Sequence, residues 1–164
     1  MTAAILKALA RQNGEGERIK MGAEEMRFVL TSAETGGRFD LIERWVSPNF
    51  KSPPLPHTHT REDWAGYLME GRLVFQLDGK VTELTAGGSL FVPRGVYFRW
   101  WNPEVTSARV LFVYTPGGFG TFFKEVFELS ARKADQVHDY DKTLAGIMKL
   151  HDKYGMIRQE PKAE

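Results

Sequence analysis

Short runs in which apolar and polar residues alternate fill the chain between Arg18 and Pro116, with Gly, Pro and Asp residues between them. Alternation with a period of two is typical of β-strands that bury one face. Glu70-Gly71 and Asp78-Gly79 predict tight hairpin turns between such runs. Many short strands at this spacing favour a β-sandwich or barrel over a βαβ fold. The strands are predicted at residues 26–31, 39–46, 64–69, 73–77, 81–84, 90–92, 98–101 and 109–114.

Beyond Pro116 the apolar period changes from two to about 3.6 residues, the period of an α-helix. A second helix is predicted over residues 142–154, and Gly155 is well placed to end it. We therefore expect one domain: an N-terminal helix or arm (1–17), a β-barrel (18–118), packed C-terminal helices (119–157) and a mobile tail (158–164). The helical stripes are Phe122, Phe123, Val126, Phe127 and Leu129, then Leu144, Ile147, Met148 and His151.

The composition narrows the class of function. The 164 residues suffice for one domain with a hydrophobic core. The 22 Lys and Arg residues nearly balance the 21 Asp and Glu residues, so no basic surface is predicted to attract nucleic acid or an anionic membrane. Cysteine is absent, which excludes disulfides, thiolate catalysis and Cys-bound zinc. The apolar stretch at 3–10 is too short for a membrane span, and a cytoplasmic protein is expected.

Two histidines, His57 and His59, lie two positions apart just after Pro56. In an extended segment both imidazoles point to the same side and can reach one centre. Together with Gly71, this segment resembles the first signature motif of the cupin superfamily, G-x5-H-x-H-x3,4-E-x6-G, although Lys51 replaces the opening glycine. The second motif, G-x5-P-x-G-x2-H-x3-N, is resembled at the family spacing by Gly87, Pro93, Gly95 and Asn102.

The resemblance covers the barrel, about residues 40–116, and implies an all-β fold, the cupin double-stranded β-helix or jelly roll. The run from Thr115 to Phe119 and the helices after it look like small bacterial cupins similar to quercetin dioxygenases. Such proteins commonly pair through their barrel edges, so the resemblance also implies a homodimer.

The metal site that the resemblance implies is incomplete. Cupins hold a metal ion with two His and a Glu of the first motif and a His of the second. Counting from Gly71 places Trp64 at the Glu position, and counting from Gly95 places Phe98 at the second His position. Aromatic carbon rings cannot coordinate a metal ion. The expectation is therefore a protein without a cofactor.

An alternative restores a metal site. The shorter motif spacing places Asp63 at the ligand position, next to Glu62. If the segment ran as one unbroken strand, Asp63 would share a face with His57 and His59. Two imidazoles and a carboxylate with open positions suit Fe(II) or a similar metal such as Mn or Ni.

Aromatic and apolar residues are expected to line the barrel interior. The barrel is either filled by these side chains or holds one small, flat apolar ligand. Glu43 alternates with Leu41 and Trp45 and is predicted to face inward with them, as a candidate acid or base or as the partner of an interior Arg. The histidines His138 and His151 are placed outside the barrel. The predicted pocket residues are Phe39, Leu41, Trp45, Trp64, Leu68, Phe98, Trp100, Phe112 and Tyr114.

Three hypotheses for function follow. In the first, an apolar, aromatic or polyketide-like metabolite binds in the barrel, and His57, His59 and Glu43 perform metal-independent acid-base chemistry of the isomerase, cyclase or lyase type. In the second, His57, His59 and a carboxylate hold the metal of a quercetin dioxygenase-like oxygenase. In the third, the barrel binds a ligand without catalysis.

Overall fold

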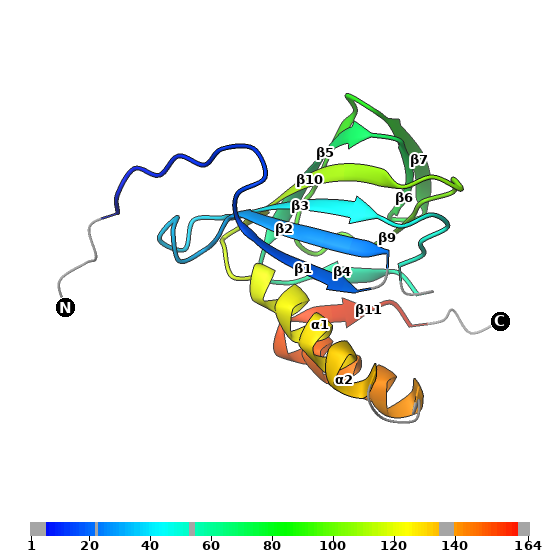
Figure 1. The fold of residues 1–164 in the computed structure, drawn as a ribbon. Coiled ribbons are helices and arrows are strands. Elements are labelled where there is room, and N and C mark those ends of the chain that lie inside the picture. Colours follow the sequence, from blue (N-terminus) through cyan, green and yellow to red (C-terminus); the bar gives the residue numbers. More distant parts are fainter. Residues whose placement is uncertain (1–5, 22, 53–54, 135–139, 161–164) are drawn as a thin grey trace.

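Two antiparallel β-sheets face each other in the computed structural model, which describes residues 6–21, 23–52, 55–134 and 140–160 (Figure 1). The strand order of the first sheet is β1-β2-β3-β10-β5-β8, and that of the second is β11-β4-β9-β6-β7. The first sheet consists of β1 (Glu17–Met21), β2 (Glu24–Leu30), β3 (Asp40–Val46), β10 (Ala108–Thr115), β5 (Asp63–Glu70) and β8 (Ser89–Val92). The second consists of β11 (Met156–Arg158), β4 (His57–His59), β9 (Phe98–Trp101), β6 (Arg72–Leu77) and β7 (Lys80–Thr85).

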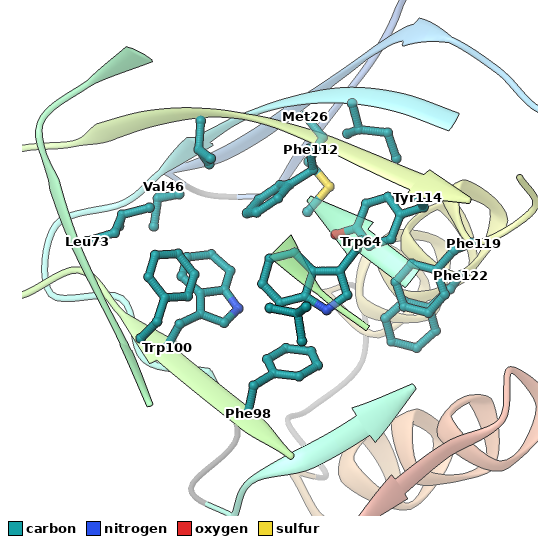
Figure 2. Close-up of a cluster of buried hydrophobic side chains, with 14 of the residues drawn as sticks. Met26, Val46, Trp64, Leu73, Phe98, Trp100, Phe112, Tyr114, Phe119 and Phe122 are labelled. Atoms are coloured by element: carbon teal, nitrogen blue, oxygen red, sulfur yellow. The ribbon is translucent and has the colours of Figure 1, made fainter. Parts of the chain in front are cut away.

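Alternating burial along the strands builds the core, as the sequence pattern predicted. In β10, the side chains of Ala108, Val110, Phe112 and Tyr114 are buried, while those between them are partly exposed. The inward side chains of both sheets meet in the middle of the barrel, where aromatic rings predominate (Figure 2). The predicted all-β barrel is confirmed.

The two predicted hairpin turns have different outcomes. Asp78 and Gly79 both have positive φ angles, 45° and 85°, and they join the paired strands β6 and β7 as expected. Glu70-Gly71 instead links β5 to β6, which belong to different sheets, so the hairpin prediction is wrong at this position. Gly71 has a φ of 82°, which lets the chain turn sharply from one sheet to the other.

Two helices follow the barrel, α1 (Gly120–Ala134) and α2 (Tyr140–Lys153). They lie together on one side of the barrel, α1 against β1 and α2 against β11 (Figure 1). Gly155 ends the second helix in the left-handed conformation, with a φ of 72°. Neither helix of the described chain is long and apolar enough to cross a membrane.

One end of the described chain differs from the expectation. Residues 6–16 form an arm, which is one of the two predicted alternatives. Arg158, expected in a mobile tail, belongs to β11, where it pairs with His57 of β4. The Gln159 N–H then donates to the Pro56 carbonyl at 2.8 Å. The barrel therefore includes a strand contributed after the helices, and residues 161–164 lie outside the described residues.

Asp40 fixes the start of α1 to the barrel. Its carboxylate is 2% exposed and accepts hydrogen bonds from the backbone N–H groups of Ser32 (2.6 Å), Gly118 (2.6 Å) and Gly120 (3.0 Å). The last two N–H groups lie at the beginning of the helix, which has no earlier carbonyl to bond them. One side chain thus satisfies donors from a loop and from the first turn of α1.

The predicted orientation of β3 is wrong. Ile42 and Arg44 face the barrel interior, whereas Glu43 and its neighbours Leu41 and Trp45 lie on the outer face. Glu43 is nevertheless 1% exposed, because Arg27 and Arg109 form ion pairs with its two oxygens. The strand carries charges on both faces, so alternation alone could not identify the inner one.

Candidate functional site

A cavity of about 290 Å³ lies between the barrel interior and the two C-terminal helices. Its lining comes from β2, β3, β4, β5, β9 and β10 on the barrel side and from α1, α2 and β11 on the other. Phe119 and Phe122 extend the cluster of rings from the barrel to α1 (Figure 2). Its lining includes Met26, Phe50, His57, His59, Trp64, Phe98, Trp100, Phe112, Tyr114, Phe119, Phe122, Phe123, Val126, Phe127, Ile147, His151 and Met156.

Strand β4 places both motif histidines in this lining. His57 and His59 are two residues apart and on the same face, and both are at most 5% exposed. His57 pairs with Phe98 of β9 and with Arg158 of β11, while Met156 lies opposite His59. The histidine strand is therefore held on both edges.

Glu62 accompanies the second histidine, which the sequence pattern did not indicate. Its Oε1 lies 2.7 Å from Nδ1 of His59, and both side chains are almost fully buried. The chain bends between β4 and β5, and this bend turns Glu62 inward instead of Asp63. A carboxylate beside an imidazole fixes the orientation of the ring.

His57 is held in its neutral form. Burial, with smaller contributions from positive charge on the nearby His59, His151 and Arg158 side chains, lowers its pKa to about 3. Its ring lies 4.4 Å from the ring of Phe98, centroid to centroid. At neutral pH the neutral ring offers one N–H donor and one acceptor nitrogen.

Two polar side chains of the cavity were not predicted. His151, expected to pack within the helices, projects from α2 into the lining, 6.0 Å from His57 between ring centroids. Arg44, expected on the outer face, lies inside, where it is paired with Glu24 at 2.8 Å and packed over Trp100. The position of His151 in an apolar helical stripe was the available signal, because that stripe covers the barrel.

The cupin domain family model matches residues 46–114, the segment that contains both histidines and most of the strands around the cavity. The strand order and the His-x-His pair in the barrel agree with this match. Residues 46–114 thus match a cupin domain.

The comparison with curated proteins finds a distant relative of this chain. Quercetin 2,3-dioxygenase of Bacillus subtilis (strain 168) is 26% identical over 114 residues, which are 69% of this chain and 33% of that protein. The chain thus spans about a third of the length of this curated relative.

Two solved structures show the shared jelly-roll fold. KdgF from Halomonas sp. has a TM-score of 0.60 at 16% identity, covering 70% of this chain and 99% of that one. An RmlC-like cupin from Shewanella frigidimarina NCIMB 400 has a TM-score of 0.58 at 20% identity, covering 70% and 96%.

The usual cupin metal ligands are not assembled in this cavity. Trp64 and Phe98 stand at two of the four ligand positions, and their rings pack at 4.8 Å between centroids (Figure 2). The Phe98 ring also contacts His57 and lies 5.2 Å from the ring of His59. Within the described ranges, no group of three or more His, Cys, Asp or Glu side chains is arranged to hold a metal ion. The residues present therefore do not fit the metal that cupins hold.

Asp63 does not complete an alternative site. The bend before β5 turns its side chain outward, where it accepts hydrogen bonds from the Arg94 backbone N–H (2.9 Å) and guanidinium (2.9 and 3.0 Å). These contacts lower the pKa of Asp63 to about 2. The predicted triad of His57, His59 and Asp63 is thus not formed.

Some of the remaining predicted site residues line the cavity and others do not. Trp100, Phe112 and Tyr114 line the cavity together with Trp64 and Phe98. Leu68 is fully buried in the core but does not reach the cavity. Phe39, Leu41, Trp45 and Glu43 are also absent from the lining, since β3 presents its other face. His138 lies outside the described residues.

The buried imidazoles predict a pH-dependent stability. Burial and the charges of Arg158 and His59 lower the pKa of His151 to about 4, against a smaller opposing effect of Asp152, and that of His57 is about 3. In the unfolded chain both imidazoles have a pKa near 6.5, so below that pH the unfolded state binds protons that the folded state does not. The free energy of unfolding is therefore highest above pH 6.5 and decreases as the pH falls toward 4.

When the pH is lowered from 7.5 to 4.5, the free energy of unfolding should decrease less in His151→Phe than in the wild type. The difference should be on the order of 2 kcal/mol, measured by urea denaturation at both pH values. Equal losses for the two proteins would contradict the depressed pKa of His151.

Proposed function

We propose that this protein is a small-molecule enzyme that binds an apolar, aromatic or polyketide-like metabolite in the cavity and moves protons on it without a metal ion. The reaction would be of the isomerase, cyclase or lyase type. One observation carries the proposal: two imidazoles face an aromatic cavity in which carbon rings occupy the other two ligand positions of the family. Such walls exclude water and orient a flat ligand.

His59 is the proposed base. Its Nδ1 faces Glu62, which leaves Nε2 as the nitrogen that can accept a proton from the ligand. The carboxylate stabilises the imidazolium that forms, so Glu62 acts as a positioning residue. His57 differs because its low pKa makes it a weak base, and its role is to donate a hydrogen bond from the neutral ring.

The proposed step conserves atoms and electrons. His59 removes a proton from a carbon next to a carbonyl, and the electron pair of the broken C–H bond moves toward the carbonyl oxygen. The His57 N–H stabilises the charge that develops on that oxygen. The imidazolium of His59 then returns the proton to the same or another carbon, and the enzyme ends as it began.

Deuterium exchange tests this proposal without knowledge of the natural substrate. The probe is 2-tetralone, a flat ketone with acidic C–H bonds, incubated with the protein in D2O and followed by mass spectrometry. We expect exchange above the buffer rate, a loss of at least tenfold in His59→Ala, and a smaller loss in Glu62→Gln. Thr58→Val is the matched control, since Thr58 lies between the two histidines on the opposite face of β4. Equal exchange by wild type and His59→Ala would show the proposal to be wrong.

The distant relationship to a quercetin 2,3-dioxygenase favours a second candidate function, a metal-dependent oxygenase. Metal analysis of protein purified without a chelator separates the two. Stoichiometric Fe, Mn or Ni that is lost in His57→Ala would favour the oxygenase and overturn the proposed acid-base enzyme.

The third candidate, a non-catalytic binding module, predicts no turnover and unchanged ligand affinity after His57→Ala. The homodimer implied by the family resemblance stays a prediction, which light scattering would test.

A further inference from the structure

Helix α2 brings a third imidazole to the cavity. The His151 side chain is 3% exposed, and its ring lies 5.7 Å from that of Phe122 between centroids. A buried histidine that only packs between helices would be expected to hydrogen-bond both ring nitrogens within the protein. The Nδ1 of His151 has no hydrogen-bond partner among the residues that the structure describes. Its burial in the cavity wall therefore points to a partner that occupies the cavity.

Three further nitrogens of the lining share this property. Nδ1 of His57, Nδ1 of His59 and Nε1 of Trp64 are also buried without a hydrogen-bond partner in the described part of the chain, although Nδ1 of His59 lies 2.7 Å from Oε1 of Glu62. The four atoms belong to β4, β5 and α2, which are far apart in sequence. Leaving a polar atom buried and unbonded destabilises a fold, so several of them around one cavity favour a ligand that bonds them.

The charges of the lining restrict what this ligand can be. His57 and His151 are neutral at physiological pH, because burial lowers their pKa to about 3 and about 4. Arg44 is paired with Glu24, so its charge is already compensated. A cationic group at the imidazole end would be repelled by Arg158, whose charge lowers the pKa of both imidazoles, and neither neutral ring could form an ion pair with an anionic group. An uncharged ligand is favoured.

We propose that His151, with His57 and Trp64, binds the hydroxyl or keto oxygen of an uncharged, flat aromatic ligand, so that α2 forms part of the ligand-binding site. The inference rests on the ligand cavity of the proposed function. Neutral imidazole offers one donor and one acceptor, and the indole N–H only donates. A hydroxyl group can meet both kinds of partner, while the surrounding rings hold the aromatic body. The volume of 290 Å³ lies at the small end of ligand pockets, which suits about two or three rings.

Two probes of nearly equal shape isolate the polar contact. 2-Naphthol carries a hydroxyl group where 2-methylnaphthalene carries a methyl group, and both are uncharged at pH 7.5. We expect His151→Phe to weaken 2-naphthol binding about fivefold, measured by probe fluorescence, while the affinity for 2-methylnaphthalene stays the same or rises. His151→Asn, which keeps a polar group at this position, should restore part of the affinity for 2-naphthol. Tyr154→Phe is the matched control, since its hydroxyl bonds Glu125 and the residue is not part of the cavity lining.

The outcomes separate this inference from the proposed function. Unchanged 2-naphthol binding in His151→Phe overturns the role of α2, whatever the deuterium exchange shows. Equal losses for both probes also overturn it, because they would indicate a change in cavity shape. If the protein catalyses no deuterium exchange but the two probes bind as expected, the proposed chemistry is overturned and the contact of His151 stands. Failure of the wild type to bind either probe overturns both.

Discussion

Replacing Glu43 by Ala should lower the free energy of unfolding by about 3 kcal/mol and leave the cavity able to bind 2-naphthol. Glu43 holds two arginines on the outer face of the first sheet, Arg27 at 2.5 Å and Arg109 through its Nε. Without the carboxylate, two guanidinium groups would remain close together, and Arg27 would be buried with its charge uncompensated. Urea denaturation measures the stability, and probe fluorescence measures the affinity.

The control for Glu43→Ala is a substitution of Glu70, the other carboxylate that pairs with Arg109. Glu70 also pairs with Arg109 at 2.9 Å, but it is largely exposed, so Glu70→Ala should cost less than about 1 kcal/mol. A stable Glu43→Ala protein that had lost deuterium exchange would restore Glu43 as a catalytic candidate. The expected result instead assigns it to the fold.

Asp40→Ala should have the largest effect on stability, a loss of about 4 kcal/mol, since it leaves three N–H groups without an acceptor. The groups belong to Ser32, to Gly118 just before α1 and to Gly120, the first residue of α1. The helix would lose its attachment to the barrel, and with it part of the cavity wall. Urea denaturation measures the loss, and 2-naphthol affinity is expected to fall in parallel.

Asp40→Asn provides the graded comparison. Asparagine keeps one acceptor oxygen in the same shape, so about half of the lost stability should return. Asp152→Ala on α2 is the control, because that carboxylate is exposed and the change should be nearly neutral. If Asp40→Ala were as stable as this control, the attachment of α1 would have to come from packing alone.

The fold was predictable because alternation and turn residues act locally. The run from Ala108 to Thr115 shows inward and outward positions clearly, since no charge falls on its inner face. β3 was misread because its inner face carries Asp40 and Arg44, which are buried with partners from distant segments. Such partners are visible only in three dimensions, so the sequence pattern favoured the face with Leu41 and Trp45.

The candidate site was predicted in part for the same reason. The motif spacing located His57, His59, Trp64 and Phe98, because a strand fixes the direction of alternate side chains. The motif spacing indicated Asp63 as the inward carboxylate, whereas the structure places Glu62 there. The chain bends between β4 and β5, and the spacing rule assumes a continuous strand. The apolar stripe of α2 indicates that His151 faces the barrel, but its place in the cavity lining depends on how α2 docks, which the local pattern does not specify.

The strand that carries His57 and His59 has β11 as one of its two neighbours, and β11 comes after both helices in the chain. During synthesis the barrel strands up to Thr115 therefore emerge before the segment that finishes the cavity. The histidine strand has no β11 neighbour until residues 156–158 have been synthesised. A protein shortened before α2 would therefore keep the barrel strands up to Thr115 but lack one edge of the histidine strand and the His151 wall of the cavity.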